Sequence, residues 1–210
     1  MIGGMARRLT SPVLVGRSSV VDQIRAALEA AREGSPRHVV IGGEAGVGKT
    51  RMLDETRTIA EAAGARVLLG GCVSMGDEGL PFAPYTEILR TLLAEDGAAT
   101  VKAMAGRGSS DLARLVPALG GDDAARDTEL FSQPRLFEAF LDLLRRLADR
   151  GPLVVQLEDL HWADAGTLAA TSYLLRAVGP DPITVMASFR SDEITRRHPL
   201  KPWLAEVARD

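Results

Sequence analysis

Eight consecutive residues have the types and spacing needed to bind phosphate groups. They are Gly43, Glu44, Ala45, Gly46, Val47, Gly48, Lys49 and Thr50, and they fit the pattern G-x-x-x-x-G-K-[ST]. Glycines allow backbone conformations that other residues avoid, so successive N–H groups of such a loop can turn toward an anion. Lys49 would reach the β and γ phosphates of a nucleoside triphosphate. The Thr50 hydroxyl would bind Mg²⁺.

The segments on either side of this loop support the same interpretation. Residues 38–41 form a short β-branched run, and residues 49–63 have the pattern of a helix that Gly64 ends. A loop that opens a helix gains further affinity for anions, because the helix N-terminus carries free N–H groups and a positive dipole end. The alternative, a glycine turn with a solvated lysine, does not require this context.

Two acidic residues follow an apolar strand predicted at residues 153–157. Acidic groups at the carboxyl end of a parallel strand face the crevice in which open α/β sheets bind ligands. Glu158 would hold the hydration shell of Mg²⁺, and Asp159 would polarise the attacking water. The alternative is a solvated strand end without a catalytic role.

The strand predicted at residues 183–189 ends in Arg190, which would lie at the same edge of the sheet. Its guanidinium could bind the γ-phosphate through charge-assisted hydrogen bonds and so distinguish ATP from ADP. A solvated arginine is the alternative. Asp164 has the position of a helix N-cap, and His161 could help to position groups near the phosphates. No second histidine or cysteine stands nearby at zinc-ligand spacing.

Strands that alternate with helices predict an α/β fold with a mainly parallel sheet. We expect an N-terminal tail at residues 1–13 and one nucleotide-binding domain at residues 14–210. Within it, residues 70–84 look like a long loop rich in Gly and Pro, and residues 72–131 look like a mostly helical insertion. Residues 120–129 form an acidic stretch typical of an exposed loop.

Composition excludes several classes of protein. A net charge of −3 and a pI near 5.7 provide no basic field for a nucleic-acid backbone, so we expect no direct nucleic acid binding by this segment. The single cysteine, Cys72, allows no intrachain disulfide. No secretory signal and no apolar stretch of membrane-spanning length are present, so a cytoplasmic protein without a membrane partner is expected.

Taken together, the motifs resemble the nucleotide-binding domain of STAND-class, AAA-like P-loop ATPases, most closely the N-terminal ATPase of large LuxR-type transcriptional regulators. The resemblance rests on the phosphate loop and on segments 15–17, 79–85, 157–164 and 187–193. It implies ATP or ADP with Mg²⁺ as ligands and a phosphate-sensing role for Arg190. It places the Arg190 strand between the other two strands of the site, and it assigns base-side contacts to Val15, Gly16 and Arg17.

The sequence departs from this family in two respects. Glu158 stands where Asp is usual, and the shorter Asp159 follows where a catalytic Glu is common, which predicts slow turnover. The fifth strand, the helical lid and the helix-turn-helix of the family are expected to be missing. The leading interpretation is an ATP-binding switch of a signalling or transcriptional regulator with slow, Mg²⁺-dependent ATP hydrolysis, which would bind itself or a regulatory protein. The alternatives are an oligomeric AAA-type ATPase motor and a non-catalytic interaction fragment that binds nucleotide weakly.

Overall fold

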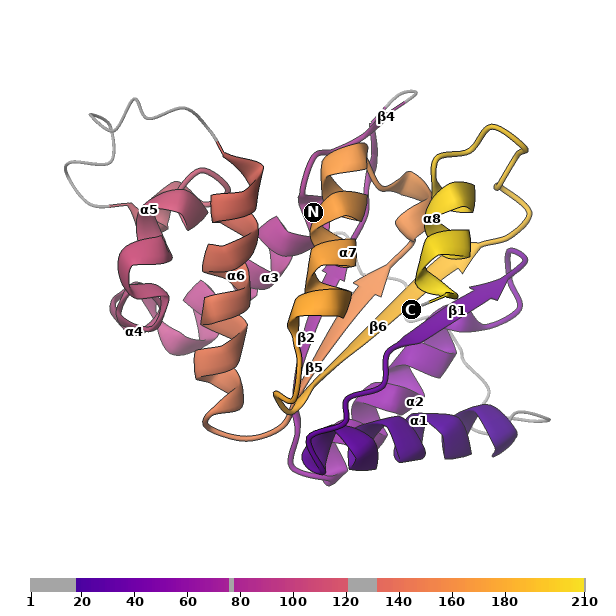
Figure 1. The fold of residues 1–210 in the computed structure, drawn as a ribbon, viewed down its shortest axis with the longest axis horizontal. Coiled ribbons are helices and arrows are strands. Elements are labelled where there is room, and N and C mark those ends of the chain that lie inside the picture. The colour runs from indigo at the N-terminus through magenta and orange to yellow at the C-terminus, as the bar shows by residue number, and fades with distance from the viewer. Residues whose placement is uncertain (1–17, 76–77, 121–131, 210) are drawn as a thin grey trace, which may run out of the picture.

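The computed structural model describes residues 18–75, 78–120 and 132–209, which form a parallel sheet with helices on both faces (Figure 1). The four strands of this sheet follow the order β1-β6-β5-β2. They are β1 (Val39–Gly43), β2 (Arg66–Gly71), β5 (Leu153–Glu158) and β6 (Ile183–Arg190). The predicted α/β fold with a mainly parallel sheet is therefore confirmed.

The two faces of the sheet are covered by different helices. Helices α1 (Ser18–Arg32) and α2 (Lys49–Ala62) pack on one face. The opposite face and the β2 edge are covered by α3 (Ala83–Asp96), α6 (Gln133–Ala148), α7 (Ala165–Ala177) and α8 (Leu200–Val207). Two shorter helices, α4 (Ala98–Ala105) and α5 (Ser109–Leu112), lie against α6, at the left of Figure 1. Short 3-10 turns complete the chain at η1 (Gly106–Gly108), η2 (Pro117–Leu119) and η3 (Leu160–Trp162).

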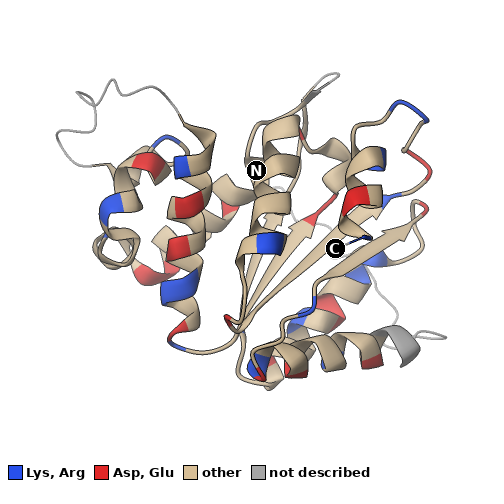
Figure 2. Cartoon of the chain, in the orientation of Figure 1, with Lys and Arg blue, Asp and Glu red and all other residues tan. Residues whose placement is uncertain are grey.

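Strand β5 is buried on both faces, which explains its continuous apolar sequence. Leu153, Val155 and Leu157 join the core beneath α6 and α7, whereas Val154 packs with residues of α1 and α2. The one buried polar residue of the strand, Gln156, donates a hydrogen bond from Nε2 to the carbonyl of Leu53 at 3.1 Å. Charged residues appear in β5 and β6 only at their last positions, as Figure 2 shows.

Parallel register brings the predicted site residues to one edge of the sheet. Gly43 at the end of β1 pairs with Arg190 at the end of β6, and Glu158 at the end of β5 pairs with Gly71 of β2. Strand β6 lies between β1 and β5, as the family resemblance implied. Among the described residues, no strand pairs with the other side of β1.

The prediction of a long loop at residues 70–84 is wrong. Strand β2 continues to Gly71, and β3 (Ser74–Met75) pairs antiparallel with β4 (Glu78–Gly79). The Leu80 N–H donates to the Val73 carbonyl at 2.9 Å and ties the base of this hairpin. Gly79 passes so close to Trp162 that a Cβ would stand 1.7 Å from its carbonyl oxygen. Here glycine marks a tertiary contact rather than an irregular loop.

Two other predicted segments lie at least partly outside the described residues. They are the N-terminal tail at residues 1–13 and the acidic loop at residues 120–129, of which only Gly120 is described. Between them, the chain forms the helices α3, α4 and α5. Helix α6 begins at Gln133.

Gly70 permits the first turn of α3 to lie directly on β2. A Cβ at this position would stand 2.1 Å from the Pro84 carbonyl oxygen, so Gly70→Ala must push two backbone segments apart. We expect the free energy of unfolding in urea to fall by about 2 kcal/mol. Gly71→Ala is the matched control, because its Cβ would meet only the Glu87 carboxylate at 3.6 Å. Equal stability of the two variants would contradict this assignment.

Candidate nucleotide-binding site

The loop from Gly43 to Thr50 connects β1 directly to α2 and lies at the carboxyl edge of the sheet. Gly46 and Gly48 have φ angles of 78° and 89°, in the left-handed region that favours glycine. Gly48 is the N-cap of α2, which therefore starts at Lys49 with its N-terminal N–H groups at the loop. This geometry is what an anion-binding loop requires.

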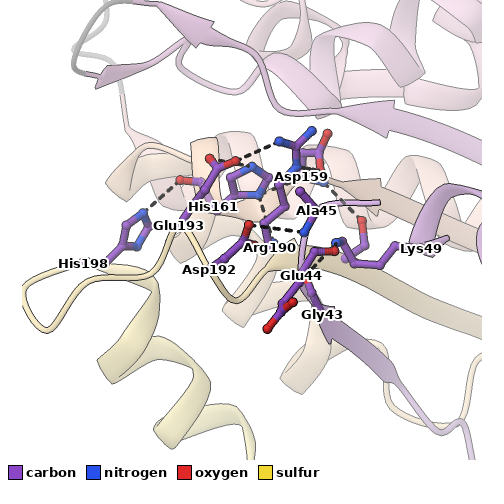
Figure 3. Close-up of polar contacts among 11 residues, drawn as sticks. Gly43, Glu44, Ala45, Lys49, Asp159, His161, Arg190, Asp192, Glu193 and His198 are labelled. Atoms are coloured by element: carbon purple, nitrogen blue, oxygen red, sulfur yellow. Dashed lines mark hydrogen bonds and ion pairs between the residues drawn. The ribbon is translucent and has the colours of Figure 1, made fainter. Parts of the chain in front are cut away.

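The side chain of Lys49 folds back over the loop. Its Nζ donates hydrogen bonds to the carbonyls of Gly43 at 2.6 Å and Glu44 at 2.7 Å, and the residue is only 8% exposed (Figure 3). The Gly43 carbonyl also accepts the N–H of Ser191 at 3.2 Å. The ammonium group is thus fixed beside the loop backbone, where a phosphate would be held.

Glu158 is the last residue of β5, and Asp159 follows it as the N-cap of η3. Burial, followed by the charges of Asp159, Asp54 and Glu87, raises the pKa of Glu158 above its ordinary value. Asp159 has a φ of 56°, a left-handed conformation that costs free energy for most residues but that aspartate tolerates. Its N–H donates to Ser188 Oγ at 3.3 Å. Such strained residues concentrate at functional sites.

Arg190 lies beside the start of the loop, because it pairs with Gly43 across the two strands. Its Nη1 donates to Glu193 Oε1 at 2.8 Å, and its Nε is 4.0 Å from Asp159 Oδ1. The side chain remains 39% exposed. The structure therefore brings Lys49, Asp159 and Arg190 to one edge of the sheet, as Figure 3 shows.

His161 contacts both Arg190 and Glu193. The sequence indicated no more than a positioning role for this histidine. Its ring is buried, and its Nδ1 accepts the N–H of Arg190 at 3.3 Å. Nε2 therefore carries the proton, and it lies 3.3 Å from Glu193 Oε2. Burial lowers the pKa of His161, although Asp159 and Glu193 oppose this shift. A neutral histidine thus links the ends of β5 and β6.

Asp164 is an N-cap, as the sequence predicted. Its carboxylate accepts the N–H groups of Gly166 and Thr167 at 2.9 and 3.0 Å. It also lies near the N–H of Phe82, which has a left-handed φ of 53° and donates to Thr167 Oγ1 at 3.0 Å. Asp164 therefore holds segment 79–85 against the start of α7.

A magnesium ion fits the oxygen donors of this edge only if phosphates complete its shell. Thr50 stands in the first turn of α2, and Glu158 ends β5, so a hydroxyl and a carboxylate would be its protein ligands. In the described ranges there is no group of three or more His, Cys, Asp or Glu residues that could hold a metal by itself. Magnesium commonly shares its ligands with substrate phosphates in this way.

The predicted and the observed residues of the site differ at two places. Val15, Gly16 and Arg17, predicted to contact the base, lie outside the described residues. Asp192 and Glu193 belong to segment 187–193, one of the segments on which the family resemblance rests, and the sequence predicts no individual role for them. Both prove to contact the site: Asp192 accepts the Ala45 N–H at 3.2 Å, and Glu193 contacts Arg190. Their position directly after β6 was the one signal available.

Comparison with known proteins fits this geometry. Residues 13–186 match the family model of the AAA ATPase domain. The chain belongs to the AAA ATPase domain family. Within the described part of this AAA ATPase domain, no helix is both long and apolar enough to cross a membrane.

This AAA ATPase domain also resembles a much longer curated protein. It is 25% identical over 189 residues to "Uncharacterized protein R02095" of Rhizobium meliloti (strain 1021). The match covers 84% of this chain but 18% of that protein, so the chain spans less than a fifth of its relative.

Two solved structures show a weaker likeness to this AAA ATPase domain. One is Drosophila ORC bound to GC-rich DNA and Cdc6, with 14% identity, a TM-score of 0.40 and coverage of 94% of this chain and 60% of that chain. The other is Drosophila ORC bound to AT-rich DNA and Cdc6, with 14% identity, a TM-score of 0.38 and coverage of 93% and 59%.

Proposed function

We propose that this AAA ATPase domain is an ATP-binding switch of a signalling or transcriptional regulator, and that it hydrolyses ATP slowly with Mg²⁺. The observation that carries the proposal is the loop from Gly43 to Thr50, with its two left-handed glycines and a buried lysine at the start of α2. The regulatory role is supported by the five motif segments that resemble STAND-class ATPases. The phosphate site is supported by the family of the domain.

Each predicted site residue has a role in this proposal. The loop N–H groups and Lys49 would hold the phosphates, and Thr50 and Glu158 would bind the magnesium shell. Asp159 would polarise a water molecule for attack on the γ-phosphate, whose developing charge Arg190 would stabilise. Val15, Gly16 and Arg17 would contact the base.

Slow turnover follows from the surroundings of Asp159. Its carboxylate Oδ1 lies 4.0 Å from Arg190 Nε and 3.8 Å from His161 Nδ1, on the side of β6. This carboxylate already faces a guanidinium of the protein, and its side chain is shorter than the Glu that is common at this position of the family. The domain would therefore hold ATP for longer than a motor does, which suits a switch between two conformations.

Isothermal titration calorimetry with ATP and ADP, with and without Mg²⁺, tests the proposal when phosphate release is measured on the same samples. We expect magnesium-dependent ATP binding and less than about one turnover per second, the low end of ordinary enzyme rates. Many turnovers per second, or ring-sized oligomers formed with ATP in light scattering, would favour the motor instead. Absence of magnesium-dependent binding would leave the non-catalytic interaction fragment.

A further inference from the structure

A carboxylate of the protein itself lies on the phosphate-binding loop. Asp192 follows β6, and its Oδ2 accepts the N–H of Ala45 at 3.2 Å (Figure 3). The adjacent Ser191 N–H donates to the Gly43 carbonyl at 3.2 Å, which fixes the start of segment 191–199 beside the loop. One of the loop N–H groups that would face a phosphate therefore already donates to an anion.

The next residue binds the second candidate phosphate contact. Glu193 accepts a hydrogen bond from Arg190 Nη1 at 2.8 Å through Oε1, and its Oε2 is 3.3 Å from His161 Nε2. Its side chain is 30% exposed, so these contacts are partly shielded from water. Two neighbouring carboxylates thus engage a loop amide and the guanidinium at the same edge of the sheet.

Carboxylates and phosphates compete for the same donors. Both are anions that accept charge-assisted hydrogen bonds, and a backbone N–H directs its single proton to one acceptor at a time. We propose that Asp192 and Glu193 form an internal anion that competes with the triphosphate, so that ATP must displace segment 191–199 to reach Ala45 and Arg190. This inference rests on the proposed function. It names the two residues that would set the preference of the domain between ATP and ADP.

Displacement of segment 191–199 would also change contacts outside the phosphate site. At the far end of the segment, His198 Nε2 lies 3.1 Å from the carbonyl of His161, and the Leu200 N–H donates to His198 Nδ1 at 3.1 Å. Helix α8 begins there, and Trp203 Nε1 donates to Ser172 Oγ of α7 at 2.7 Å. Segment 191–199 therefore connects the phosphate site to α8. Its release by ATP, but not by ADP, would loosen the contacts at the start of α8.

The test neutralises the two carboxylates without changing their shape. Affinities of the parent, Asp192→Asn, Glu193→Gln and the double variant are measured by calorimetry for the nonhydrolysable analogue AMP-PNP and for ADP, both with Mg²⁺. We expect the double variant to bind AMP-PNP about tenfold more tightly, because one exposed and one partly exposed contact contribute roughly this much together. ADP affinity should change less than about threefold by the same arithmetic. Asp142 is an exposed carboxylate on α6. Asp142→Asn is the control for each single variant, because it also removes one negative charge.

Hydrogen exchange distinguishes displacement from a general effect of charge. In the parent, AMP-PNP but not ADP should speed exchange in peptides that cover residues 191–199. Unchanged exchange there, or variants that bind AMP-PNP no more tightly than the parent, would overturn the internal anion. Binding by the double variant but not by the parent would support it. If neither binds nucleotide and both unfold cooperatively on heating, the proposed function fails together with this inference.

Discussion

A Lys49→Ala variant is expected to lose ATP affinity by at least about a hundredfold. This corresponds to roughly 3 kcal/mol, the scale of two hydrogen bonds to charged groups. The carbonyls of Gly43 and Glu44 hold Lys49, so its charge already lies beside the loop before ATP binds. Such preorganisation makes its loss costly for binding. Isothermal titration calorimetry with Mg²⁺ and ATP measures the change.

The same substitution also tests the stability of the loop. Removing the ammonium leaves two carbonyls with fewer donors, and we expect the free energy of unfolding to fall by about 1 kcal/mol. Lys201→Ala is the matched control, because it removes an equal charge from the exposed first turn of α8. If Lys49→Ala bound ATP as tightly as Lys201→Ala, the loop would not be the phosphate site.

Glu158→Gln is expected to reduce ATP hydrolysis about a hundredfold, the usual contribution of a positioned acid–base or metal-ligating carboxylate. The amide keeps the shape of the side chain but removes the negative charge that would hold the magnesium shell. Phosphate release under single-turnover conditions measures the change. Hydrolysis at the parent's rate would show that Glu158 has no part in the reaction.

The same variant should be more stable than the parent at neutral pH. The pKa of Glu158 is raised in the folded state, so the folded protein retains a proton that the unfolded chain releases. Stability is therefore highest below the ordinary pKa of glutamate and falls as pH rises through the raised one. Melting temperatures of the variant and parent should be similar at low pH and diverge toward pH 7. A constant difference at all pH values would contradict this cause.

Local patterns were sufficient to predict much of this domain. The loop at Gly43, the strand before Glu158 and the strand before Arg190 each depend on residues that are adjacent in sequence. Their convergence follows from parallel strand direction, which a strand and helix pattern implies. The Asp164 N-cap is equally local, because its partners are Gly166 and Thr167.

Contacts between distant segments could not be predicted in this way. The β3–β4 hairpin depends on the approach of Gly79 to Trp162, a contact between segments far apart in sequence. The bond between Asp192 and Ala45 joins two loops that only the completed sheet brings together. The proton position on His161 likewise depends on Arg190 and Glu193. Residue type alone does not specify such partners.

The close packing of α3 on β2 gives the helical half of the domain a direct effect on the site. Glu87 of α3 accepts the N–H of Gly71 at 2.7 Å, and Gly71 pairs with Glu158. Both burial and the charge of Glu87 contribute to the raised pKa of Glu158. A partner that lifted α3 from β2 would hydrate this carboxylate and ease its ionisation, so force applied to distant helices would be converted into a greater affinity for magnesium.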